Sequence, residues 1–159
     1  MKKNTGYLIG ALSLLLLVGA TSFKTVPPPR PSASGHGTLT IPGDITRQFS
    51  FHANTMPNGS VQGSGVLTYT GGQLKVMFDI DCLSVTGNTA TMSGTITRND
   101  DNPAQVGLPC RFKVVDNGEG SNSNPDLMTL LQSGPALPNC NAPLNIALSP
   151  IEGGNIQVK

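Results

Sequence analysis

Residues 73–97, QLKVMFDIDCLSVTGNTATMSGTIT, decide the fold. Apolar and polar side chains alternate on both sides of a turn at residues 86–88, and this period of two is typical of β-strands with one buried face. The stretch therefore predicts a long antiparallel hairpin around a three-residue turn. Its inward-facing residues are expected to be Leu74, Val76, Phe78, Ile80 and Cys82 on the first strand and Ala90, Met92, Gly94 and Ile96 on the second.

A second hairpin is predicted upstream, where alternating segments at residues 47–53 and 61–69 flank a loop rich in turn residues at 54–60. A register that places aromatic rings over strand glycines would fill the gaps that the glycines leave. The expected pairs are Ala53 with Val61, Phe51 with Gly63 and Phe49 with Gly65.

The two hairpins are joined by a predicted tight turn that contains Gly71 and Gly72. Two glycines supply the positive φ angles of a two-residue hairpin loop. The length of this turn sets a further register, which keeps apolar faces together. The expected pairs are Tyr69 with Leu74, Leu67 with Val76 and Gly65 with Phe78.

Shorter segments of period two predict strands at residues 37–41, 108–115, 126–132 and 155–158. The proline-rich residues 133–150 are expected either to wrap the surface or to plug an end of the fold. About eight strands joined by short turns favour an all-β fold. We expect a single antiparallel up-and-down β-barrel in which the last strand pairs with the first. A two-sheet β-sandwich built from the same strands is the alternative.

The amino terminus has the features of an export signal. Two lysines precede an uncharged apolar run, and a small-residue cleavage site follows it. The expected organisation is a signal peptide at residues 1–20, a proline-rich linker at 21–34 and the β-barrel domain at 35–159. The protein is therefore expected to be secreted or periplasmic.

The charge balance excludes partners that need a strongly charged surface. After loss of residues 1–20, the ten Lys and Arg residues fall to eight, against nine Asp and Glu. Such a balance gives no field that would hold nucleic acid or an anionic membrane. The remaining length suits one domain with its own core. We expect a monomer that binds no nucleic acid and does not insert stably into a membrane.

Three cysteines, Cys82, Cys110 and Cys140, remain after cleavage. An exported chain favours a disulfide, and an odd number of cysteines leaves one thiol over. Spacing alone leaves all three pairings open. The chain has no CxxC pair or Cys/His cluster, so the sequence does not predict a zinc site.

Several short phrases occur together in the chain: GHGT at 35–38, FSF at 49–51, DIDCL at 79–83, GNTA at 87–90, VDNGEG at 115–120, PD at 125–126 and EGGNIQV at 152–158. In this combination they resemble a group of secreted, uncharacterised bacterial proteins, similar in style to the small domain labelled post-COAP-1. The resemblance covers the chain from His36 to its end. It implies a compact secreted β-domain, without an established activity. It also implies a disulfide between Cys82 and Cys140 and a free Cys110.

Residues 116–126, DNGEGSNSNPD, form the richest polar loop of the chain. Calcium takes six to eight oxygen ligands from carboxylates, amides and carbonyls, on a chain that bends sharply. The loop therefore predicts a candidate calcium site, although its spacing differs from that of an EF-hand. The alternative is a polar loop held by Asx turns. The candidate ligands are Asp116, Glu119, Asn122, Asn124 and Asp126.

A pair of carboxylates, Asp79 and Asp81, is expected on the polar face of the central strand. Such a pair can carry acid–base chemistry if its two environments separate the pKa values. With His36 or His52, the pair gives a hypothesis of a small extracytoplasmic hydrolase. The chain lacks a nucleophile elbow, a metalloprotease helix motif and a phosphate-binding loop, so no catalytic residue is assigned.

The leading functional hypothesis is a secreted, non-enzymatic β-domain with a structural or binding role, since a complete strand pattern is present without a catalytic motif. The hydrolase is the first alternative. The second is a carrier of a small apolar ligand inside the barrel, which an eight-stranded barrel just allows. No cofactor is expected apart from calcium at the polar loop.

Overall fold

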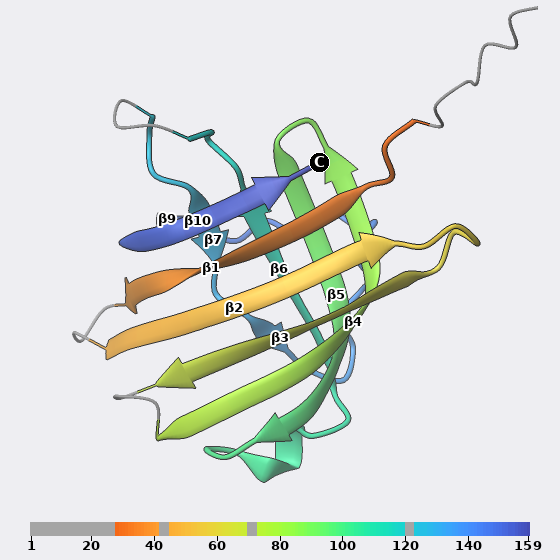
Figure 1. The fold of residues 1–159 in the computed structure, drawn as a ribbon. Coiled ribbons are helices and arrows are strands. Elements are labelled where there is room, and N and C mark those ends of the chain that lie inside the picture. Colours follow the sequence, from red (N-terminus) through yellow and green to blue (C-terminus); the bar gives the residue numbers. More distant parts are fainter. Residues whose placement is uncertain (1–27, 42–44, 70–72, 120–122) are drawn as a thin grey trace, which may run out of the picture.

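A computed structural model describes residues 28–41, 45–69, 73–119 and 123–159 of the chain. The expected signal peptide lies outside the described residues, as does most of the expected linker. The described part forms one antiparallel sheet that curls into a half-barrel (Figure 1). Its strands are β1 (Ser32–Ile41), β2 (Ile45–Thr55), β3 (Val61–Tyr69), β4 (Leu74–Thr86), β5 (Thr89–Asn99), β6 (Pro109–Val115), β7 (Leu127–Thr129), β8 (Gln132–Ser133), β9 (Leu148–Pro150) and β10 (Gly153–Val158).

The strand order confirms the predicted up-and-down architecture. Neighbours in the chain pair from β1 through β7, and the order along the sheet is β10-β1-β2-β3-β4-β5-β6-β7-β9, with β8 pairing separately with β6. The last strand pairs with the first as predicted, with Gly35 opposite Ile156. Strand β1 begins at Ser32, inside the segment expected to be linker. In Figure 1, β10 and the strands from β1 to β3 form the front layer, and β5, β6 and β7 lie behind it.

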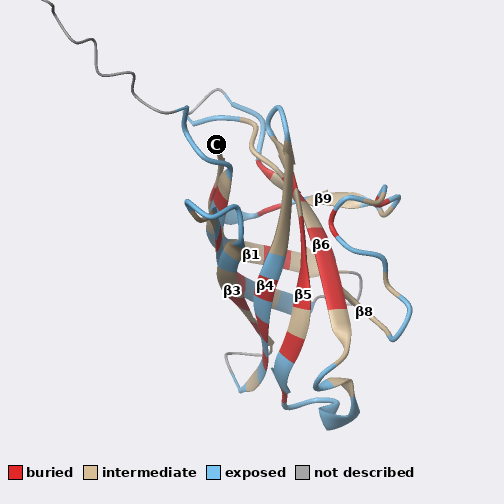
Figure 2. Cartoon of the chain, turned by 90° about the vertical axis from the view of Figure 1, so that its right-hand side faces the viewer, coloured by how far each residue is buried: buried red, intermediate tan, exposed pale blue. Residues whose placement is uncertain are grey.

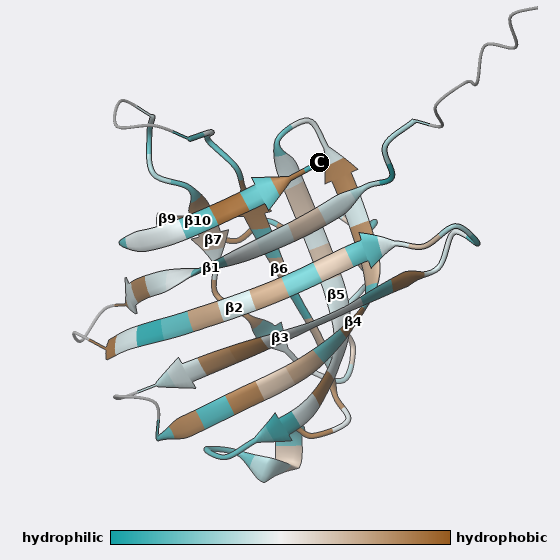
Figure 3. Ribbon diagram, in the orientation of Figure 1, coloured by the Kyte–Doolittle hydropathy of each residue, from teal (hydrophilic) through white to brown (hydrophobic). Residues whose placement is uncertain are grey.

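The alternation of apolar and polar residues determines which face of each strand is buried, as the hydropathy colouring of β2 and β4 shows (Figure 3). The inward side chains of both layers meet in one core. Its aromatic centre is formed by Phe51, Phe78 and Phe112, whose ring centroids lie 5.2 Å (Phe51–Phe112) and 5.6 Å (Phe78–Phe112) apart. Edge-to-face contacts of this kind add to the stabilisation that burial gives.

The predicted register between β3 and β4 is confirmed, with Tyr69 opposite Leu74. The predicted register between β2 and β3 is wrong by two residues, since Thr55 rather than Ala53 faces Val61. Strand β2 extends to Thr55, because the loop after it is only five residues long and closes with a hydrogen bond from Met56 N to Ser60 O. A shift of two residues keeps every side chain on its predicted face.

Aromatic rings do cover strand glycines, one as predicted for the pair of Gly65 and Phe78 and two with partners other than those predicted. Phe78 lies over Gly65, while Phe51 and Phe49 lie over two glycines of β1, Gly35 and Gly37. The absence of a Cβ at these glycines makes room for the rings. Small and large residues on adjacent strands therefore interdigitate, which is how a curved sheet fills its concave side.

Replacing Gly65 with alanine is expected to lower the free energy of unfolding by about 1–3 kcal/mol, because the new Cβ would overlap the ring of Phe78. Urea unfolding followed by circular dichroism measures the change. Gly134→Ala is the control, since the nearest atom to its Cβ would be 4.0 Å away, and its stability should stay within about 0.5 kcal/mol of wild type. Equal stabilities for the two variants would contradict the packing of Phe78 on Gly65.

Two β-bulges in the β4–β5 hairpin were not predicted. The register shifts between Ile80 and Cys82, leaving Asp81 as the extra residue on β4, and again where Thr97 is the extra residue on β5. The prediction that Cys82 points inward is therefore wrong, because the bulge turns the following residues over. Leu83 and Val85 pack against the core instead.

The hairpin turn is also shorter than predicted. Thr86 pairs with Thr89, so the loop contains two residues, Gly87 and Asn88, rather than three. Gly87 has a φ of 60°, in the left-handed region that favours glycine. The side chain of Asn88 donates to Asp116 O over 2.7 Å, which fixes the turn against the end of β6.

The single strand expected at residues 126–132 is two short strands, β7 and β8, which pair with different parts of β6. Residues 134–147, called the strap below, then cross the outer side of β6 as expected for a surface-wrapping segment. Arg111 Nη2 donates to Ala142 O and Lys113 Nζ donates to Leu144 O. Figure 2 shows that much of β6 is buried. The strap explains why Arg111 is buried, although Cys110 and Phe112 on either side of it belong to the core.

Candidate functional site

The polar loop at residues 116–126 lies between β6 and β7 and contacts the last strand, β10. Asp126 is buried, with 6% of its surface exposed. Its Oδ1 accepts a hydrogen bond from Asn117 N over 2.8 Å, and its Oδ2 accepts one from Ile156 N over 2.7 Å. One carboxylate thus orders its own loop and binds the backbone of β10.

Two further acidic residues of the loop bind β10 in a similar way. Asp116 accepts hydrogen bonds from Gly118 N over 2.8 Å and from Val158 N over 2.9 Å. Glu119 Oε1 accepts from the side-chain amides of Asn155 over 3.2 Å and Gln157 over 2.8 Å. We call Asp116, Glu119 and Asp126 the carboxylate clasp.

The clasp replaces a neighbouring strand. The backbone N–H groups of Ile156 and Val158 are two residues apart on β10, so they point to the same edge of the strand, away from β1. A buried N–H group without an acceptor costs stability, and an edge that is left open invites pairing with other chains. The carboxylates therefore connect β10, at one edge of the sheet, to the loop between β6 and β7, and within the described residues no strand pairs with this edge of β10.

The structure brings together some of the predicted calcium ligands. Glu119, Asn124 and Asp126 line an open cavity of about 370 Å³ together with Glu152 and Asn155. Asp116 lies outside that lining, and Asn122 lies outside the described residues. Within the described residues, no group of three or more His, Cys, Asp or Glu side chains is arranged to hold a metal ion. Calcium binding stays a prediction.

The second predicted constellation is divided by the bulge at Asp81. Asp79 lines a depression of about 190 Å³ on the outer side of the sheet, together with His52 and Ser64. Asp81 lines a separate cavity of about 200 Å³ beside Cys110 and the strap. The two carboxylates therefore do not converge on one pocket.

Ser64 lies between His52 and Asp79 in the sheet register. In a hydrolytic triad the imidazole stands between the hydroxyl and the carboxylate, so that it can take the hydroxyl proton while the carboxylate orients it. Here the hydroxyl occupies the middle position. This order favours a row of independent polar groups over a nucleophilic triad.

His36 lines a neighbouring depression of about 420 Å³, which includes Asn155 and Gln157 of β10. The two depressions share Ser50 and Phe51 in their linings. We call the combined feature the outer groove. Its lining residues lie on the strands from β10 to β4, which are neighbours in the sheet.

The disulfide between Cys82 and Cys140 is present, as the family resemblance implies, and Cys110 is free and buried. The bond attaches the strap to the outer side of β4. Cys140 N also donates to Ser93 Oγ on β5 over 3.1 Å. Burial, with a contribution from the nearby Asp81 carboxylate, raises the pKa of the Cys110 thiol to about 12.

The raised pKa makes the Cys110 thiol inert and its contribution to stability dependent on pH. Because the thiolate is the reactive form, native protein at pH 8 is expected to react with a thiol reagent far more slowly than unfolded protein. A folded pKa above the ordinary value of 9.0 stabilises the fold at pH values below 9, and this stabilisation is lost as the pH rises toward 12.

The measurement is urea unfolding at pH 8 and pH 10.5 for wild type and Cys110→Ala. The wild type is expected to lose more stability than the variant between these pH values, since all other titrating groups are shared. Parallel losses in both proteins, or fast thiol labelling of the folded protein at pH 8, would contradict the buried neutral thiol.

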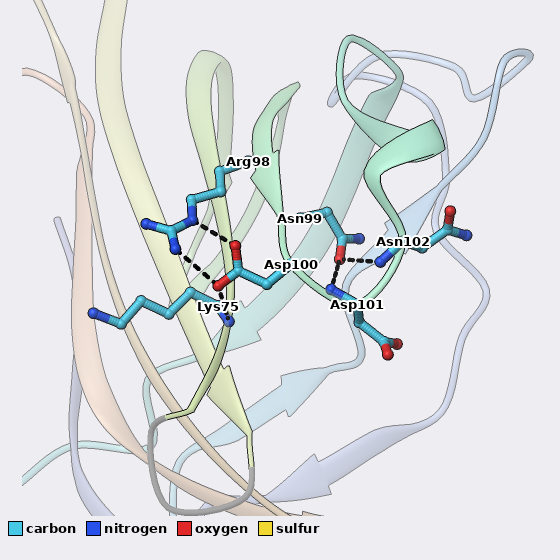
Figure 4. Close-up of polar contacts among 6 residues, drawn as sticks. All are labelled: Lys75, Arg98, Asn99, Asp100, Asp101 and Asn102. Atoms are coloured by element: carbon cyan, nitrogen blue, oxygen red, sulfur yellow. Dashed lines mark hydrogen bonds and ion pairs between the residues drawn. The ribbon is translucent and has the colours of Figure 1, made fainter.

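An ion pair lies at the end of the β4–β5 hairpin that is far from its turn at Gly87 and Asn88 (Figure 4). Arg98 Nε donates to Asp100 Oδ1 over 2.6 Å, and Lys75 N donates to Asp100 Oδ2 over 3.1 Å. The hydrogen bond with Arg98 lowers the pKa of the Asp100 carboxyl. Asn99 Oδ1 accepts from Asp101 N and Asn102 N, so this cluster shapes a turn. Its groups are engaged with one another and with backbone.

Sequence reasoning missed the side chains of β10 as part of the site. Asn155, Gln157 and the preceding Glu152 line the cavities, and Asn155 and Gln157 contact Glu119 of the polar loop across 36 and 38 residues of sequence. The alternation of Asn155 and Gln157 with apolar neighbours indicates an outward polar row. It does not indicate the segment that the row faces.

A scan of family models, a search of curated proteins and a search of solved structures found no match to this chain. The resemblance to the post-COAP-1 group accordingly stays a prediction. Within the described residues, no helix is long and apolar enough to cross a membrane.

Proposed function

We propose that this chain is an extracytoplasmic, non-enzymatic β-domain that acts as a structural or binding module. The export signal in the sequence and the disulfide between Cys82 and Cys140 both suit an oxidising compartment. The absence of a strong net charge suits a partner that is not a polyanion.

The observation that carries the proposal is the use of the acidic loop. Each carboxylate of the clasp accepts hydrogen bonds from backbone or side-chain N–H groups, and Asp116, Glu119 and Asp126 all bind β10. Carboxylates that are committed to holding the fold are poor candidates for proton transfer, which needs a group that can gain and lose a proton freely.

The filled interior supports a surface role over transport of an apolar ligand. Aromatic rings occupy the centre of the half-barrel. The space between Leu39, Phe49, Leu67 and Met128 at one end of the core is about 10 Å³, roughly the size of one water molecule. A ligand inside would have to displace packed side chains, at a cost of the kind seen on overpacking.

The proposal is tested with the purified mature domain and a set of chromogenic carboxylate esters, phosphate esters and glycosides. We expect no turnover above the buffer blank. The matched variant is Asp79→Asn, which removes the carboxylate of the outer groove without changing its size. Turnover by wild type that is lost in Asp79→Asn would overturn the non-enzymatic role and favour the hydrolase alternative.

Metal removal tests the calcium alternative independently. The clasp oxygens already accept from N–H donors. Thermal unfolding of the mature domain in EDTA and in excess calcium is therefore expected to give melting temperatures within about 1 °C of each other, as for a protein that does not bind calcium. A rise of several degrees with calcium that Asp126→Asn abolishes would instead make the clasp a metal site.

A further inference from the structure

We propose that the outer groove binds a neutral, hydroxyl-rich oligosaccharide that lies across the strands. This inference rests on the proposed function, since it names the ligand class of the binding module. Most of its lining side chains are polar and do not contact the clasp; Asn155 and Gln157 are the exceptions, since both donate to Glu119. Its two depressions measure about 420 Å³ and 190 Å³ and join at Ser50.

The groove is long enough for an oligomer. Its lining extends from Gln157 on β10 to Asp79 on β4, and these strands are four neighbours apart in the sheet. With strands about 4.8 Å apart, the groove is roughly 19 Å long. A single sugar ring would fill only part of that length, whereas a short linear chain could contact every strand.

The lining is hydrogen-bonding at every step along this path. The register aligns Gln157, Ser34, His52, Ser64 and Asp79 across five adjacent strands. Amides, imidazoles and hydroxyls each offer both a donor and an acceptor. Sugar hydroxyls have the same double character, so a row of such groups suits a polyol chain better than a ligand with only donors or only acceptors.

The charges of the lining exclude other linear ligands. Within the described residues, neither depression is lined by lysine or arginine, and Asp79 is the carboxylate of the lining. Nucleic acids and acidic glycans need cations to replace their counterions. A neutral oligosaccharide does not need cations in the groove. Met77 and Val66 add apolar contacts at the β4 end, which suit the C–H faces of sugar rings.

The mode of binding follows from the position of the rings. Phe51 and Phe78 belong to the lining of the groove, but both residues are buried in the core. Stacking on an exposed aromatic platform is therefore not the source of affinity. Hydrogen bonds from several strands carry it, and we expect dissociation constants on the order of 0.1–1 mM, with affinity that rises with oligomer length.

The experiment uses the mature domain, isotope-labelled for NMR titration, with tetramers of neutral β-glucan, xylan, mannan and chitin. Ser50→Tyr should block the junction of the two depressions. Gln48→Tyr is the matched control, because it lies on the same strand and face but outside the groove. Both positions are exposed and tyrosine suits a strand, so both variants are expected to fold.

The expected result is binding of at least one tetramer, with chemical-shift changes at Ser34, His52 and Ser64. Its affinity should be at least tenfold weaker for Ser50→Tyr and unchanged for Gln48→Tyr. No binding by any neutral tetramer, or equal binding by both variants, would overturn the inference. Preferential binding of an acidic glycan or a peptide would overturn it as well. Cleavage of a bound tetramer would support the groove as the site but overturn the non-enzymatic function.

Discussion

Asp126→Asn is expected to lower the free energy of unfolding by about 2–4 kcal/mol, although the substitution hardly changes the size of the side chain. The two carboxylate oxygens accept from Asn117 N and Ile156 N, and Asp126 is almost fully buried. In asparagine one of these oxygens becomes an NH₂ group, which is a donor facing a donor. A buried N–H group that loses its acceptor costs about 1–3 kcal/mol, and loss of the charge weakens the remaining bond.

The measurement is urea unfolding, combined with hydrogen exchange of the β10 amides. The amide of Ile156 is expected to exchange much faster in Asp126→Asn, since the contact between the clasp and β10 is where the variant opens first. Asp79→Asn is the control, because Asp79 is exposed on the outer face and its stability should stay within about 0.5 kcal/mol of wild type. Equal losses in both variants would mean that the clasp does not hold β10.

The faces of the strands could be predicted from the sequence, because they depend on local alternation. The predicted register of β3 and β4 is confirmed, with Gly65 opposite Phe78, since a short turn leaves little freedom in the pairing. The predicted register of β2 and β3 is wrong, because turn residues alone do not determine the length of the loop. Thr55 is a good strand residue that continues β2.

The bulge at Asp81 is visible in the sequence as a change in the phase of the apolar alternation. Inward residues have even numbers from Leu74 to Ile80, but the next apolar residues, Leu83 and Val85, have odd numbers. A change of phase within one strand is what one extra residue produces. The prediction that Cys82 points inward continues the alternation of Leu74 to Ile80 past the bulge, where it no longer holds.

The carboxylate clasp could not be found from local pattern, because its contacts join distant parts of the chain. Asp126 meets Ile156 over 30 residues, and Asp116 meets Val158 over 42. The composition of residues 116–126 indicates a loop with many polar oxygens, but it does not indicate their partners. Whether its carboxylates bind calcium or the edge of a strand depends on what the fold places beside them, and the fold places the N–H groups of β10 there.

The outer groove, like the clasp, is formed by residues that are distant in the sequence. Each of its strands, considered alone, shows an ordinary polar face. The hollow arises only when the registers of β10 and β1 to β4 bring Ser34, Ser50 and Ser64 together between longer side chains. The register predicted for β2 and β3 would place Ser50 directly opposite Ser64, whereas in the structure Ser50 lies opposite Val66 and Ser64 opposite His52. Site geometry therefore needs more accurate registers than fold class does.

Removing the disulfide by the double substitution Cys82→Ala and Cys140→Ala is expected to lower the free energy of unfolding by about 4 kcal/mol. The bond closes a loop with a sequence separation of 58 residues, and on the chain-entropy model a loop of this length restricts the unfolded chain by that amount. The strap should also loosen locally, because Arg111 and Lys113 would then hold it through two hydrogen bonds to carbonyl oxygens.

The check compares urea unfolding with and without a reducing agent. Wild type should lose stability when reduced, whereas the double variant should be insensitive to the reductant. Cys110→Ala is the matched control, since Cys110 is the free cysteine and its variant should keep the full reductant-dependent loss. If Cys110→Ala became insensitive to the reductant as well, the bond in solution would involve Cys110. A bond between Cys110 and Cys140 would attach the strap to β6 rather than β4, since Cys110 lies on β6.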